Sequence, residues 1–258
     1  PSINLLSTLG ASASRGREET VGMFGTGYLY GLALLAREGL LENTKICLGK
    51  DVYTFLLEEE DIKDARGNES SIIRILMKKQ NGGKIDLNIH VGFGAIDWND
   101  LGMALREFIS NAVDGQTDYN GNPSDVVIEH TENSRASSEY IRIYIPMTNA
   151  VAQYIDRLKE NFLMFRFNYN PKQLILSKDK PGPARFYRKG VFVGEFGEKS
   201  LYDYNISNLE LKECRIVDSY EAERKAAAAL MQDNSGKMKS YFGSEEHWEH
   251  QINKYYFK

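Results

Sequence analysis

The stretch LREFISNAVDG (residues 105–115) carries three oxygen-bearing side chains that could act together: Glu107, Asn111 and Asp114. Spacings of four and three residues put side chains on one face of a helix. A carboxylate can activate water, and an amide oxygen can ligate Mg²⁺. Since the intervening apolar residues form a separate buried stripe, the polar face is expected to line a cleft suited to nucleotide hydrolysis. The alternative is an ordinary amphipathic surface helix.

A second stretch, VGMFGTGYLYG (residues 21–31), places Gly22, Gly25 and Gly27 directly before an apolar, helix-like run. Glycine lets the backbone approach a ligand closely. The start of a helix adds unpaired N–H groups and partial positive charge. The pattern therefore predicts a phosphate cradle, and the alternative is a tight turn with close packing of a helix on a sheet.

The elements that would position these residues can be read from periodicity and turn residues. Helices are expected over 28–39, ending at Gly39, and over 97–111, with Asp97 or Asn99 as N-cap. The polar segments 7–20 and 114–125 are expected to be loops, and a further helix is expected near 150–162. Strands are expected at 44–49, 52–57, 71–78, 84–94, 125–130 and 139–146.

The composition changes near residue 178, where KDKPGPAR contains two of the six prolines. Beyond it we expect a strand with a glycine break over 186–196 and helices over 218–232 and 244–257. The sequence thus predicts an α/β protein (an α+β sandwich) with a domain at 1–177 and a smaller C-terminal α/β extension or second domain at 178–258.

The overall composition narrows the class of protein. The 258 residues are 42% hydrophobic and 26% charged, which is ordinary for a soluble globular chain. The net charge of −4 weakly disfavours sequence-independent binding of nucleic acid by the whole chain. Two distant cysteines, Cys47 and Cys214, suit a reducing compartment. No apolar run is long enough to span a membrane, and no secretory signal is evident. We therefore expect a cytoplasmic protein.

Together the two stretches resemble the GHKL family, which comprises gyrase B, heat-shock chaperones, histidine kinases and MutL. The family's N box, E-x-x-x-N-x-x-D-[AG], is matched by Glu107, Asn111, Asp114 and Gly115. Its G2 box, G-x-x-G-x-G-[FYL], is matched by Gly22, Gly25, Gly27 and Tyr28, and LGASASR at 9–15 is similar to the ATP lid. The resemblance spans about 115 residues and implies a Bergerat-type ATP-binding sheet with helices on one face.

The resemblance also implies roles for individual residues. Glu107 would be the general base, and Asn111 would ligate the Mg²⁺ that bridges the phosphates of ATP. Backbone N–H groups from Gly25 to Gly27 would hold the phosphates. The remaining implied ATP-site residues are Gly22, Thr26, Tyr28 and Asp114, with Ser12, Ser14 and Arg15 in the lid.

Two features depart from the family pattern. The lid and G2 box precede the N box by about 80 residues, whereas the family has the reverse order, so we expect a circular permutation. The family's D-x-G-x-G box, which reads adenine, is not found. In the family this box comes directly before the lid, so here it would fall upstream of Pro1.

Two further stretches carry residues that could bind a ligand. Arg188 or Lys189, in FYRKGVFVGEF, could reach the γ-phosphate, as a basic residue of the second domain does in some family members; an exposed basic pair is the simpler explanation. The run His247-Trp248-Glu249-His250 has too few ligands for a zinc site. The sequence predicts Mg²⁺-dependent ATP hydrolysis coupled to dimerisation or a protein partner. The alternative is a non-catalytic interaction module on a degenerate GHKL scaffold.

Overall fold

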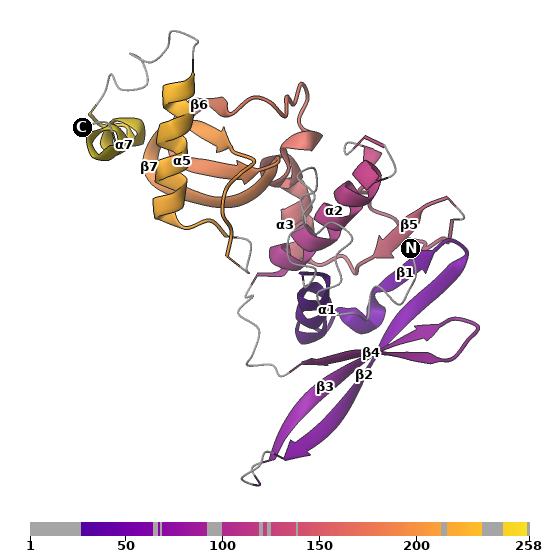
Figure 1. Ribbon diagram of the computed structural model, residues 1–258. Helices are drawn as coiled ribbons and strands as arrows, with labels where there is room; N and C mark the ends of the chain where they lie inside the picture. Colours follow the sequence, from indigo (N-terminus) through magenta and orange to yellow (C-terminus); the bar gives the residue numbers. More distant parts are fainter. Residues whose placement is uncertain are drawn as a thin grey trace. The chain divides into compact units, whose positions relative to one another are not determined.

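The protein is described here from a computed structural model. The model describes residues 27–63, 67, 69–91, 100–118, 121–122, 125–137, 139–212, 216–233 and 245–256. The chain divides between Asp156 and Arg157 into two compact units (Figure 1). The predicted boundary lay later, at residue 177. Residues 157–177 belong with the second unit because they bond to its strands: Leu163 N–H donates to Gly190 O (2.7 Å) and Tyr187 Oη–H to Glu160 O (2.8 Å).

The first unit contains a five-stranded sheet with the order β4-β3-β2-β1-β5, in which every neighbouring pair is antiparallel. Its strands are β1 (Lys45–Leu48), β2 (Asp51–Lys63), β3 (Glu69–Lys79), β4 (Lys84–Val91) and β5 (Ile141–Tyr144). The strand predicted at 125–130 is wrong, because its described residues join no ladder. Both edges of β1 are already paired, with β2 and β5, which leaves that segment no place beside it.

The β2–β3 hairpin is longer than predicted. Its register runs without a break from Tyr53↔Lys79 to Lys63↔Glu69. The inner half contributes Phe55 and Ile75 to the core, whereas β2 is exposed from Glu59 onward. Charged side chains on that outer half suit solvent and discourage pairing with other chains.

Helices α1 (Gly27–Arg37), α2 (Leu101–Asp118) and α3 (Asn149–Asp156) lie together beside this sheet (Figure 1). The predicted C′ glycine of α1 is confirmed: Gly39 has φ +67°, and the next N–H, of Leu40, donates to Leu35 O (2.9 Å). Helix α2 starts after Asp100, whose Oδ1 accepts from Gly102 N–H (2.9 Å). The predicted N-caps Asp97 and Asn99 lie outside the described residues.

Helix α2 also extends into the predicted loop at 114–125. Val113 and Asp114 are buried, so tertiary packing holds the helix past the point where turn-forming residues would end it.

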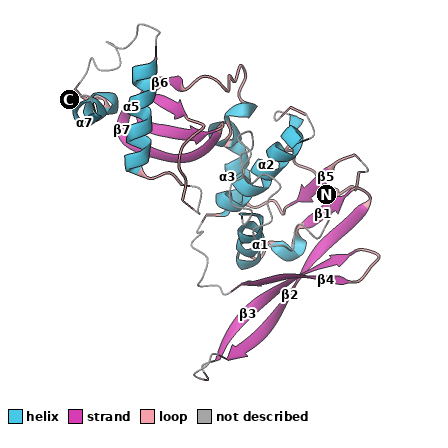
Figure 2. Ribbon diagram, in the orientation of Figure 1, coloured by secondary structure: helices cyan, strands magenta, loops and turns pink. Residues whose placement is uncertain are grey.

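The second unit is built on a long two-stranded hairpin, β6 (Ile175–Arg188) and β7 (Val191–Asn205) (Figure 2). Strand β6 runs through KDKPGPAR, where the change in composition predicted the start of the second domain. In a two-stranded sheet each strand has an outer edge where a missing N–H costs no ladder bond. The pairing also shifts register between Ser177 and Ala184. The other elements are α4 (Leu158–Asn161), η4 (Leu163–Phe165), α5 (Ser219–Gln232) and α7 (Trp248–Tyr256).

An aromatic core joins this hairpin to the C-terminal helix. Phe186 stacks on Tyr204 with ring centroids 5.1 Å apart, and Trp248 of α7 contacts both rings edge-on at 5.9 and 5.8 Å. Gly197 (φ +67°) makes room, since a Cβ there would lie 2.7 Å from Trp248 Cγ. Helix α5 adds a flat apolar face of buried alanines at 222, 226, 227 and 229.

Glu249 fixes α7 to β7 through a fully buried carboxylate. Its Oε1 accepts from the hydroxyl of Ser200, from Leu201 N–H (3.1 Å) and from Tyr204 Oη–H (3.1 Å). Burial, and then the carboxylate beside it, raise the pKa of Tyr204. A buried charge held by several donors is stable where it is, but costly to disturb.

We expect Glu249→Ala to destabilise the protein by about 3 kcal/mol, because three buried donors lose a charged acceptor. Urea unfolding of the full chain measures this. Glu246→Ala is the control, since the Glu246 side chain is 77% exposed and its removal should change stability by less than about 0.5 kcal/mol. Equal effects for the two variants would contradict the role given to Glu249.

Candidate functional site

The first residue of α1 lies directly on the carboxylate of Glu107 in α2. Gly27 is buried, and a Cβ at this position would come within 2.6 Å of Glu107 Cδ and closer still to Oε2. Only glycine leaves room for that carboxylate. The described structure therefore brings together one residue from each of the two stretches that the sequence singled out.

The next turns of α1 continue this close packing. Gly31 faces the ring of Phe108, whose Cζ would be 3.1 Å from an added Cβ, and Tyr28 meets the same ring edge-on at 5.6 Å. Burial raises the pKa of Tyr28. Gly27 and Gly31 thus let α1 and α2 pack closely. The alternative weighed from the sequence was close packing of a helix on a sheet, whereas here the glycines contact a second helix.

Glu107 sits within a polar cluster between helices. Its side chain has no exposed surface, and Arg106 Nε lies 3.9 Å from its Oε1 with only 10% of that side chain exposed. On the α3 side, Tyr154 packs over Gly102. Burial raises the pKa of Tyr154 first, the nearby Asp100 and Glu107 add to the rise, and Arg106 opposes it. Charged and hydroxyl groups therefore meet in a site largely shielded from water.

The three oxygen-bearing residues of α2 do not share one environment. Glu107 and Asp114 are buried, whereas Asn111 is exposed. At 100° per residue, Asn111 is turned about 40° from Glu107 and about 60° from Asp114. It therefore lies at the rim of the buried face, where solvent and ions reach it.

Several predicted residues fall outside the described residues: Ser12, Ser14, Arg15, Gly22, Gly25 and Thr26. Lys189 is described and belongs to the second unit. It forms the β6–β7 turn with Gly190, with φ values of 51° and 80°, as a two-residue type I′ turn requires.

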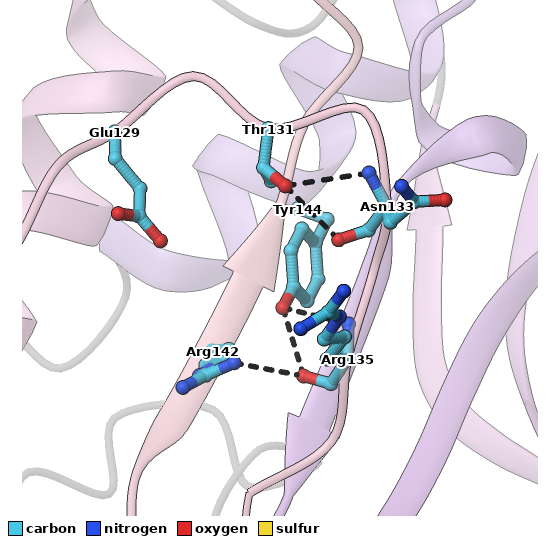
Figure 3. A pocket seen from close by; sticks show the side chains of 6 residues that line it. All are labelled: Glu129, Thr131, Asn133, Arg135, Arg142 and Tyr144. Carbon is cyan, nitrogen blue, oxygen red and sulfur yellow. Dashed lines mark hydrogen bonds between the residues drawn. The ribbon is translucent and has the colours of Figure 1, made fainter.

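A shallow pocket of about 380 Å³ lies on β5 and the segment before it (Figure 3). Tyr144 Oη donates to Arg135 O (2.8 Å) and accepts from Arg135 N–H (2.9 Å), and Arg142 Nη1 donates to the same carbonyl (3.3 Å). All of its lining residues are polar: Glu129, Thr131, Asn133, Arg135, Arg142 and Tyr144. Sequence reasoning missed this site. The alternation in EYIRIYIP was the available signal, since it puts Arg142 and Tyr144 on one face.

Two residues of the His247–His250 run have structural contacts. Trp248 is in the aromatic core and Glu249 is occupied by its hydrogen bonds. Within the described part of the chain, no group of three or more His, Cys, Asp or Glu side chains could hold a metal ion.

Comparison of the chain with protein-family models, with curated proteins and with solved structures finds no match. Among the helices described here, none has the length and apolar character needed to cross a membrane.

We expect Gly27→Ala to destabilise the protein by about 1–3 kcal/mol, since an added methyl group would overlap the buried Glu107. Gly115→Ala is the matched control. Gly115 is also helical, but a Cβ there meets nothing within 4 Å, so alanine should stabilise by about 0.5–1 kcal/mol. The measurement is the urea midpoint of each variant, and a neutral Gly27→Ala would show that the contact is not tight.

Proposed function

We propose that this protein binds Mg²⁺-ATP and hydrolyses it where α1 begins beside Glu107. The observation that carries the proposal is the packing of Gly27, the last glycine of the G2-like stretch, onto the carboxylate of the N-box-like stretch. Two short motifs from distant parts of the chain are more easily explained by one ligand site than by chance. The sheet would then be a permuted Bergerat-type fold.

In this proposal the residues act mainly by position and charge. Glu107 orients the attacking water as general base, and Asn111, exposed at the rim of α2, supplies an amide oxygen to Mg²⁺. N–H groups at the start of α1 receive phosphate oxygens. Mg²⁺ would neutralise the charge on the phosphates, which is the main need in phosphoryl transfer.

The proposal extends to the setting of the reaction. Closure of the lid-like residues 9–15 over ATP would couple hydrolysis to dimerisation or to a change in a protein partner. The buried unpaired thiol of Cys47 suits a reducing, cytoplasmic location.

A second candidate is a non-catalytic interaction module that keeps the scaffold. The observation favouring it is the burial of Glu107, which has no exposed surface. A base in that state cannot activate water until the α1–α2 packing opens. Turnover therefore separates the two candidates.

We expect 1 mM Mg²⁺-ATP to raise the thermal midpoint of the full chain. Ligand at about 100 times Kd adds about 2.7 kcal/mol to the free energy of unfolding. Asn111→Ala should lose the part of the shift that depends on Mg²⁺, and Asn43→Ala serves as control for an exposed asparagine elsewhere in the same unit. No shift in the wild-type chain would remove the nucleotide proposal.

We expect Glu107→Gln to retain the ATP-induced shift and to lower kcat at least about a hundredfold, because the amide fits the same space and cannot accept the proton. Phosphate release under saturating ATP measures this. Wild-type binding without turnover would favour the interaction module, and undiminished turnover in Glu107→Gln would remove the assigned base.

A further inference from the structure

Charge is divided unevenly between the two units. Residues 1–156 contain 14 Lys and Arg against 22 Asp and Glu, whereas residues 157–258 contain 18 against 14. The net charge of −4 therefore conceals an acidic unit of −8 and a basic unit of +4. The excess is concentrated at 157–190, with nine basic residues and two acidic ones, Glu160 and Asp179. A basic half is typical of proteins with an anionic partner.

Local packing gathers these basic residues on one part of the second unit. Phe162 forms a β-bridge with Val191, and Leu163 N–H donates to Gly190 O. An added Cβ on Gly190 would meet Tyr169 Oη at 2.7 Å. The segment 157–172 is therefore held against the β6–β7 turn, which carries Arg188 and Lys189.

Some of the cations in this region are paired with carboxylates, whereas two exposed lysines are not. Glu160 lies 3.0 Å from both Arg157 and Arg185, and Asp203 lies 3.3 Å from Lys178. Lys159 and Lys172 are exposed, and no carboxylate in the described part of the chain lies within ion-pairing distance of either. Their ammonium groups face solvent.

An aromatic side chain projects from the middle of this basic segment. Phe167 is 93% exposed, an unusual position for a ring of that size. The next residue, Asn168, has φ 62°, which bends the backbone sharply at this point. Arg166 is fixed beside it, since Nε donates to Lys159 O (2.7 Å) and Nη2 to Tyr187 Oη (3.0 Å).

We propose that this surface, formed by Arg157, Lys159, Arg166, Phe167 and Lys172, binds single-stranded nucleic acid. The cations would track the phosphates, and Phe167 would stack on a base. A base can stack on Phe167 only if it is not already stacked within a duplex. The exposed ring therefore favours single-stranded over double-stranded nucleic acid. An anionic membrane is less well matched, because Phe167 is followed by Asn168 and Asn170 and is the one apolar side chain of this surface.

The test is fluorescence anisotropy of a labelled 20-nucleotide oligo(dT) with the full chain, across 25–200 mM NaCl. The wild-type protein should bind, with affinity falling steeply as salt rises. Phe167→Ala should weaken binding at least about fivefold without changing the salt slope. Lys159→Gln/Lys172→Gln should lower the slope by about 1.4, at about 0.7 per phosphate contact.

Tyr220→Ala and Lys63→Gln are matched controls, since both side chains are 67% exposed and lie on other elements. Both should bind as wild type. Absence of binding at 25 mM NaCl, or equal loss in Phe167→Ala and Tyr220→Ala, overturns the proposal. So does duplex DNA binding as tightly as oligo(dT), or Phe167-dependent binding to phosphatidylserine vesicles alone. None of these results depends on ATP turnover.

Discussion

The first unit depends on a carboxylate held where a neighbouring helix has no side chain. Glu107 occupies the space that a Cβ of Gly27 would fill, so α1 and α2 can approach only with glycine at that position. Because a buried charge is stable only with polar partners, Arg106, whose Nε lies 3.9 Å from Glu107 Oε1, must also be in place. Packing and candidate chemistry are therefore one constraint, and neither can change alone.

The second unit also combines a glycine that leaves room for a neighbouring side chain with a buried carboxylate, but no reaction is proposed for it. Gly197 has no side chain where the Trp248 ring packs. The next residue of α7, Glu249, accepts three hydrogen bonds from β7. Here a buried carboxylate serves to dock a helix. Burial of an acid is thus not evidence of catalysis by itself. What distinguishes Glu107 is that its carboxylate lies beside Gly27, the first residue of α1.

The sequence predicted most elements of the first unit because their periodicity and turn residues agree, as at Gly39 and along β1 to β4. It failed where tertiary pairing decides: the apolar run 125–130 finds no partner strand, and two prolines are accepted in β6. For the candidate site, the meeting of Gly27 with Glu107 follows from residue types, but the exposure of Asn111 does not. For the pocket, the alternation in EYIRIYIP places Arg142 and Tyr144 on one face, but no local pattern encodes the path of residues 129–135 beside them.

The β2–β3 hairpin has a consequence for how this chain can change over time. Its unbroken register from Tyr53↔Lys79 to Lys63↔Glu69 means that residues can be added or removed at the tip in pairs while every core side chain keeps its face. Insertion or deletion of a single residue in one strand would instead move its side chains to the opposite face of the sheet or force a β-bulge. The outer arm is therefore free to lengthen or shorten by even steps among descendants, while its inner half stays fixed by Phe55 and Ile75.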